Sequence, residues 1–122
     1  MKQNIIKEKS YNFALRIVKA YQFLTAEKKE YILSKQLLRS GTAIGALVRE
    51  AEYGESSPDF IHKLRISLKE ANETQYWLEL LKDSQFIEED AFNSINNDCV
   101  ELIKLLTSII NKRRKNENIN SK

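Results

Sequence analysis

Apolar residues recur along the chain at spacings of three and four, the pattern of one face of an α-helix. Four segments carry this pattern, and we predict helices over residues 10–26, 31–53, 58–82 and 89–112. The stripes expected to face a core are Ala14, Ile17, Tyr21 and Leu24 with Phe13 and Val18 beside them; Leu33, Leu37, Gly41, Ile44, Val48 and Ala51; Phe60, Leu64, Ser67, Ala71, Thr74, Leu78 and Leu81; and Phe92, Ile95, Cys99, Leu102, Leu106 and Ile109.

The last two stripes alternate spacings of four and three, which is the period of left-handed bundle packing. The connections are short, so consecutive helices must run antiparallel. Before the third helix, Ser57 has the chemistry of an N-cap and Pro58 that of a first helical residue. We therefore predict an all-α fold, an antiparallel up-down-up-down four-helix bundle over residues 1–112, followed by a polar basic tail over residues 113–122.

Two glycines, Gly41 and Gly45, lie one turn apart inside the second predicted helix. A glycine in the middle of a helix costs up to about 1 kcal/mol relative to alanine. Small residues let a second backbone approach closely, and the third helix has its own in Ser67 and Ala71. We expect these four residues to form a close crossing of the second and third helices. A phosphate-binding loop would need a strand before the glycines.

The third predicted helix has more apolar surface than one stripe requires. Ile66, Trp77 and Leu80 fall on a second face, with Tyr76 nearby. Tryptophan and tyrosine are common anchors of protein interfaces, so we expect an oligomer interface here. The alternative is a broad core helix that loops partly cover.

Charge is unevenly distributed along the 122 residues. Residues 1–29 carry a net charge of +5, residues 30–111 carry −6 and residues 112–122 carry +4, within a total of +3.

One cysteine excludes an internal disulfide and suits a reducing compartment. No stretch reaches the roughly 20 apolar residues of a membrane span, and the N-terminus lacks the apolar run of a signal peptide. We expect a cytoplasmic protein without a membrane partner.

Residues 36–81 read QLLRSGTAIGALVREAEYGESSPDFIHKLRISLKEANETQYWLELL. With the apolar fourth helix, this block resembles the four helix bundle proteins found as reading frames inside intervening sequences of 23S ribosomal RNA genes, the S23 family. One departure is Leu47, where the family usually has asparagine.

The resemblance implies a bacterial four-helix bundle of unknown function that forms a homopentamer, without an established catalytic activity. A distantly similar group serves retroelement reverse transcriptases as a basic accessory protein. The resemblance also covers Arg39, Glu50, Glu70 and Glu73, for which we expect ion pairs between helices or between subunits; the alternative is a solvated face.

Catalytic and metal chemistry find little support in the sequence. Di-iron bundles need paired Glu-x-x-His motifs, but the chain has one histidine, His62, without a glutamate three residues before it. Cys99 lies on a core stripe, where a cysteine acts as a small apolar residue. We predict a protein that is not an enzyme and has no metal and no cofactor.

The N-terminal and C-terminal segments of the chain are both basic. An up-down-up-down topology brings these two segments to the same end of the bundle. A ring of subunits would multiply this charge, which favours association with the RNA or DNA backbone. The alternatives are a tail that serves solubility, and a scaffold or protein-interaction module for a partner such as a reverse transcriptase or an RNA-processing factor. The residues expected to contact nucleic acid are Lys2, Lys7, Lys9, Lys112, Arg113, Arg114 and Lys115.

Overall fold

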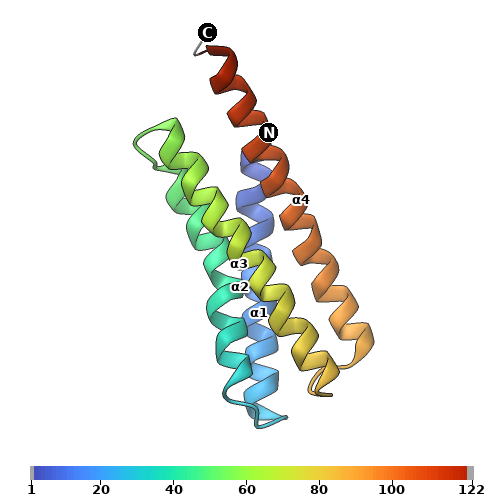
Figure 1. Ribbon diagram of the computed structural model, residues 1–122. Coiled ribbons are helices and arrows are strands. Elements are labelled where there is room, and N and C mark those ends of the chain that lie inside the picture. Colours follow the sequence, from blue (N-terminus) through green and yellow to red (C-terminus); the bar gives the residue numbers. More distant parts are fainter. Residues whose placement is uncertain (1, 121–122) are drawn as a thin grey trace.

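The computed structural model describes residues 2–120, with side chains for residues 5–117. Within this range the chain forms four helices and no strand: α1 (Lys2–Ala26), α2 (Leu33–Glu52), α3 (Ser57–Asp83) and α4 (Glu89–Asn120). The helices run alternately up and down, and the free ends of α1 and α4 lie at the same end of the molecule (Figure 1). The predicted antiparallel four-helix bundle is confirmed.

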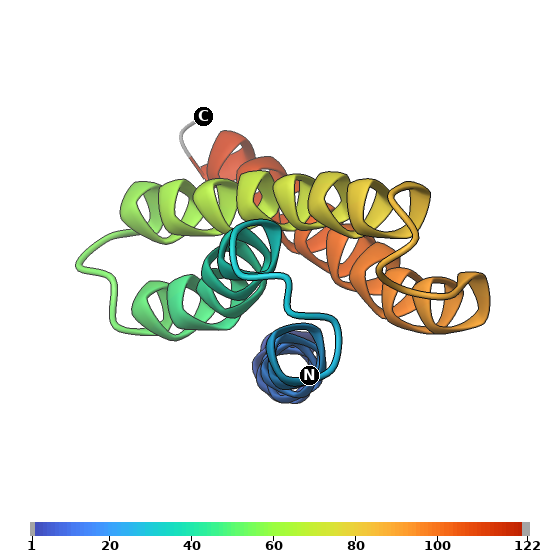
Figure 2. The ribbon, with the colours of Figure 1, turned by 90° about the horizontal axis from the view of Figure 1, so that it is seen from below.

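Each helix packs against two neighbours. The neighbouring pairs are α1 with α2, α2 with α3, α3 with α4 and α4 with α1, whereas the diagonal pairs make no backbone contact among the described residues. The α1–α4 side is the loosest of the four. Viewed from the end that holds the α1–α2 and α3–α4 connections, α4 runs obliquely away from α1 (Figure 2). One side of the bundle is therefore more open than the others.

The core follows the predicted stripes most closely in α4. All six predicted residues of that helix are buried, and so are all those of α3 except Phe60, which is half-buried beside the buried Ile61. The α1 stripe is partly wrong. Val18 is exposed and Tyr21 is half-buried, whereas Ile6 and Ser10 are buried. The core stripe of α1 therefore starts nearer the N-terminus, because the helix begins at Lys2 rather than at residue 10.

The start of α2 is capped by a residue outside the helix. The Glu30 carboxylate accepts hydrogen bonds from the backbone N–H groups of Ile32, Leu33 and Ser34 at 3.2, 3.0 and 2.7 Å. The Ser34 hydroxyl donates in return to the Glu30 carbonyl at 2.7 Å. Desolvation raises the pKa of Glu30, but the three N–H donors outweigh it and the pKa lies below its ordinary value. One carboxylate thus satisfies three N–H groups that a helix start leaves unpaired.

The start of α3 differs from the prediction by one residue. Ser56, rather than Ser57, is the N-cap, and its hydroxyl accepts a hydrogen bond from the Asp59 N–H at 3.2 Å. Ser57 and Pro58 both lie in the first turn, where proline loses no helical hydrogen bond. Ser57 is then free to contact the end of α4, as described below.

Candidate nucleic-acid interface

The end of the bundle that holds both termini carries the predicted basic residues. α4 continues past its last buried residue, Ile110, and ends at Asn120 instead of residue 112. Figure 1 shows this last part of α4 extending beyond the other three helices. The segment predicted as a tail is helical instead, in keeping with the high helix propensity of lysine and arginine. The basic residues are thus held on a helical projection.

Lys112, Arg114 and Lys115 form the exposed part of this projection, which we call the basic tip. All three side chains are exposed. Within the described part of the chain, none of them forms an ion pair or a hydrogen bond. Their charges are therefore available to a ligand from solution.

Arg113 differs from its neighbours because it is used inside the subunit. Its guanidinium donates a hydrogen bond to the Ser57 hydroxyl at 3.2 Å and lies 4.0 Å from the centre of the Phe60 ring. These contacts fasten α4 to the first turn of α3. Of the four consecutive basic residues, Arg113 holds the projection in place while the other three are exposed.

The predicted lysines of α1 are also engaged. Lys7 forms an ion pair with Glu52 of α2 at 3.0 Å, and Lys9 forms one with Glu101 of α4 at 3.3 Å. All four side chains in these pairs are well exposed. The side chain of Lys2 lies outside the described ones. Five of the seven predicted residues thus fall into a free group of three at the basic tip and an ion-paired group of two on α1, while Arg113 is held by α3.

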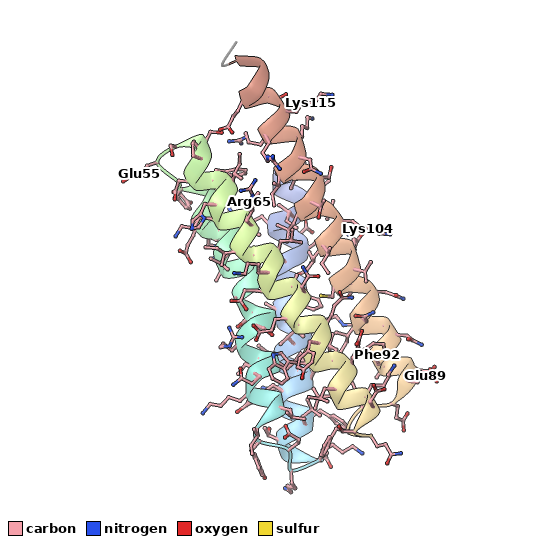
Figure 3. All side chains as sticks on the ribbon, viewed as in Figure 1. Glu55, Arg65, Glu89, Phe92, Lys104 and Lys115 are labelled. Atoms are coloured by element: carbon pink, nitrogen blue, oxygen red, sulfur yellow. The ribbon has the colours of Figure 1, made fainter. Side chains whose placement is uncertain are left out.

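The α3–α4 connection, at the opposite end of the bundle, is acidic. Asp83, Glu88, Glu89 and Asp90 are all exposed there, around the α3–α4 connection. Figure 3 shows Glu89 at that end and Lys115 at the other, with Arg65 and Lys104 in the half nearer Lys115. The basic residues of α4 and this acidic cluster therefore lie at opposite ends of the bundle.

The glycines of α2 pack against a different helix from the one predicted. A Cβ added at Gly41 would lie 2.7 Å from Cγ1 of Ile17, and one at Gly45 would lie 3.2 Å from the backbone oxygen of Ser10. Both contacts are with α1, not α3. The prediction of a close crossing with α3 through the glycines is wrong, because these two residues face the side of α2 that α1 covers.

Polar contacts join α2 and α3 instead. The Ser67 hydroxyl donates to the Ile44 carbonyl at 2.9 Å, and the Thr74 hydroxyl to that of Ser40 at 3.0 Å. Ala71, which lies between Ser67 and Thr74 in the sequence, is fully buried. Its carbonyl accepts a hydrogen bond from the Cys99 thiol of α4 at 3.3 Å. The small residues of α3 thus lie in the core next to both α2 and α4.

The charged residues named by the resemblance form pairs between helices. Arg39 of α2 pairs with Glu70 of α3 at 3.2 Å and also with Glu73. The Trp77 indole N–H donates to Glu73 at 2.9 Å. This hydrogen bond, followed by those from Arg39, lowers the pKa of Glu73. Glu50 pairs with Lys63 at 3.3 Å.

The predicted interface on α3 is only partly exposed. Tyr76 is 57% exposed and packs edge-on against Trp77, whereas Ile66, Trp77 and Leu80 are half-buried. Trp77 also packs against the core. The second apolar face of α3 therefore presents one large exposed residue with three half-buried residues around it.

A second exposed apolar face lies on α1 and was missed from the sequence. Tyr11, Leu15 and Val18 are 54%, 46% and 36% exposed. Their spacing of four and three places them on one side of the helix. This stripe could have been found by placing the core stripe of α1 on Ile6 and Phe13, because Val18 would then have fallen outside the core.

The two residues considered for catalysis or metal binding, His62 and Cys99, differ in exposure. His62 is exposed, whereas Cys99 is buried, and desolvation raises the pKa of its thiol to about 12. A thiol with this pKa is protonated at neutral pH and is a poor nucleophile. Among the described residues, no three His, Cys, Asp or Glu side chains gather where they could hold a metal ion. In the same part of the chain, no helix is long and apolar enough to cross a membrane.

Two comparisons with known proteins give matches. The family model for 23S rRNA-intervening sequence protein matches residues 2–108. A crystal structure from Bacteroides thetaiotaomicron, of a protein with unknown function from the S23 ribosomal protein family, is 58% identical; the match covers 91% of this chain and 99% of that one, with a TM-score of 0.90. No curated protein matches the chain. The family match ends before the basic tip begins.

Proposed function

The chain belongs to the 23S rRNA-intervening sequence protein family, and from this premise we propose that it is a non-catalytic, homo-oligomeric protein of the bacterial cytoplasm that associates with the RNA or DNA backbone. The observation that carries the proposal is the basic tip, Lys112, Arg114 and Lys115, exposed and without partners among the described residues. Because the family match ends at residue 108, the proposal rests on this chain's own residues.

Backbone binding without sequence recognition is the mode that this geometry supports. Cations that contact phosphates release bound counterions, and this release supplies most of the affinity of non-specific binding. A helical projection such as the end of α4 can meet phosphates without entering a groove. We expect the tip to bind through charge, with little discrimination among sequences.

The lysines of α1 would add to the same site. The pairs of Lys7 with Glu52 and Lys9 with Glu101 are between exposed side chains, and exposed ion pairs contribute only about 0–1 kcal/mol. A phosphate could therefore replace either carboxylate at small cost. Lys7 and Lys9 are expected to contribute less than the tip, since each must leave a partner.

Oligomerisation belongs to the same proposal. The exposed face of α1 (Tyr11, Leu15, Val18) and that of α3 (Tyr76 with its half-buried neighbours) lie on diagonally opposed helices. Two different faces that meet head-to-tail generate a closed ring when the rotation closes. A ring of subunits in one orientation, such as the pentamer we expect, would place all basic tips on one side.

A protein-interaction scaffold is the second candidate function. The same two apolar faces favour it, because exposed aromatic and aliphatic residues also serve as docking surfaces for other proteins. Such a scaffold would bind its partner with a weak dependence on salt, whereas phosphate binding weakens steeply as salt rises. Salt dependence therefore separates the two functions.

The test is a matched pair of charge-removing variants. We expect Lys112→Ala, Arg114→Ala and Lys115→Ala together to weaken binding to generic RNA about tenfold or more at low salt. The control removes three exposed cations far from the tip, by Lys19→Ala, Lys28→Ala and Lys35→Ala, and so changes net charge equally. Fluorescence anisotropy with a labelled single-stranded RNA measures both. Equal losses in the two variants would show that only net charge matters and would refute a site at the tip.

A further inference from the structure

The open α1–α4 side of the bundle contains a groove that none of the roles above uses. The groove has a volume of about 600 Å³ and lies near the α3–α4 connection, at the end far from the termini. The two helices that line it, α1 and α4, run obliquely to each other in Figure 2. Its apolar lining consists of Ala20, Phe23, Phe86, Ile87, Ala91 and Ile95.

The lining is apolar yet accessible. Phe23 is 45% exposed and Ala91 is exposed, whereas Ile95 is buried and forms part of the core. Phe86 and Ile87 are half-buried and pack against that core. The groove therefore has a fixed apolar floor that is continuous with the core, and apolar walls that an occupant could cover.

The two rims of the groove differ in charge. Arg16, Lys19 and Lys28 line the side of α1, and Glu88 lines the side of α4. Arg16 is already used, since it pairs with Asp98 of α4 at 2.6 Å. The α1 rim is thus positive and the α4 rim negative.

Lys19 and Lys28 are the free charges of the α1 rim. Neither forms an ion pair among the described residues, and the Lys28 ammonium lies 5.8 Å from the centre of the Phe23 ring. Two unpaired cations beside an exposed aromatic side chain complement a ligand that is apolar on one side and carboxylate-bearing on the adjacent edge.

We propose that this groove docks an amphipathic helix of a partner protein, with its apolar stripe on Phe23, Ile87 and Ile95 and its acidic edge against Lys19 and Lys28. Helices bind apolar grooves through side chains at spacings of three and four, and α1 and α4 supply the two sides of this groove. Charge complementarity fixes which edge faces α1. Glu88 on the opposite rim repels an acidic edge and would favour a basic one.

The probes are two helical peptides of about 14 residues, four turns of helix. Both carry the same leucine stripe; one has glutamates along the edge that would face α1, and the other has lysines in the same positions. We expect the acidic peptide to bind the full-length protein about tenfold tighter than the basic one at low salt. Lys19→Glu with Lys28→Glu should reverse this preference, whereas the control Lys69→Glu with Lys104→Glu, at exposed cations on α3 and α4, should not.

A second variant tests occupancy of the groove itself. Ala91→Arg fills the groove from an exposed position and adds a positive charge, so a loss of acidic-peptide binding would come from blocked space rather than from repulsion. The control is Ala46→Arg, at an exposed alanine of α2. Circular dichroism checks that both variants fold, and amide chemical shifts of Phe23, Ile87 and Ala91 locate the bound peptide.

Several results would overturn the proposal. Equal affinity for the two peptides, unchanged binding by Ala91→Arg, or shifts outside the groove would each do so. Binding of decanoate in the groove without binding of the peptide would assign the groove to a small amphiphile instead. A fall in oligomer mass in Ala91→Arg alone would show that a second copy of the chain covers the groove.

Discussion

Replacement of Gly41 by alanine tests how the two glycines shape the bundle. In an exposed helix interior this change is stabilising by up to about 1 kcal/mol, because alanine has the higher helix propensity. At Gly41 the new Cβ would lie 2.7 Å from Cγ1 and 2.9 Å from Cγ2 of Ile17. Carbon atoms in favourable contact are about 3.5–4.0 Å apart, so either the Ile17 side chain or one of the two helices must shift.

The structure indicates that the shift is costly. Ile17 is fully buried, and its side chain cannot turn away into solvent. Inserting a methyl group into a well-packed core costs about 1–3 kcal/mol. Subtracting a propensity gain of about 1 kcal/mol leaves Gly41→Ala destabilised by about 0–2 kcal/mol. Gly45→Ala should cost less, because its Cβ would lie 3.2 Å from the nearest atom of Ser10.

The assay is denaturant unfolding followed by circular dichroism, at one fixed protein concentration because assembly affects stability. Ala46→Gly, at an exposed position of the same helix, measures the propensity difference without a packing change. The decisive comparison is Gly41→Ala in an Ile17→Ala background. With the isoleucine removed, the clash is gone, and Gly41→Ala should become neutral or stabilising.

A reversal of sign between the two backgrounds is the expected result. If Gly41→Ala stabilises the wild-type protein, the close contact with Ile17 does not limit the helix approach, and the structural role given to Gly41 is refuted. If Gly41→Ala destabilises both backgrounds equally, the cost lies within α2 rather than between helices.

Two further predictions concern capping and assembly. Glu30→Gln should lower the free energy of unfolding by about 0.5–2 kcal/mol at neutral pH, with Glu27→Gln as the control. Because the folded pKa of Glu30 is lowered, the difference in stability between wild type and Glu30→Gln should shrink as pH falls below the ordinary carboxyl pKa of 4.5. A difference independent of pH would contradict this prediction. Light scattering should give a mass several times 14.2 kDa, and Leu15→Arg or Tyr76→Arg should reduce it; a wild-type monomer would refute the interface on both helices.

Periodicity alone predicted the core of α3 and α4, because their stripes repeat over many turns and leave one consistent solution. It was right only in part on α1, where apolar residues occur on two sides of the helix. Phe13, Ile17 and Leu24 of the predicted set are buried, whereas Val18 is exposed and the buried Ile6 lay outside the predicted helix. Nothing local distinguishes a core face from an interface face, since both are apolar.

The partner of the glycines could not be predicted for a related reason. A small residue in a helix indicates that something comes close, but not which of two neighbouring helices does. Ser67 and Ala71 made α3 the natural choice, yet α1 meets the glycines through Ile17 and Ser10. The choice depends on how α2 is rotated about its axis, which the whole bundle sets.

Sequence reasoning identified the basic site as a set of charges without ranking its members. Seven cations at one end follow from topology, whereas their partners follow from three-dimensional packing. Lys7 and Lys9 meet carboxylates of other helices, and Arg113 meets Ser57 and Phe60. Only the structure separates these from the free cations of the basic tip.

The salt dependence of RNA binding tests the proposed function most directly. For wild-type protein and the triple variant Lys112→Ala, Arg114→Ala and Lys115→Ala, the logarithm of the binding constant is plotted against the logarithm of salt concentration. Each lost phosphate contact on single-stranded RNA should reduce the slope by about 0.7, so we predict a reduction of up to about 2 with the oligomer intact. A wild-type protein without RNA or DNA affinity at low salt, or a triple variant with the wild-type slope, would contradict nucleic-acid binding by the basic tip.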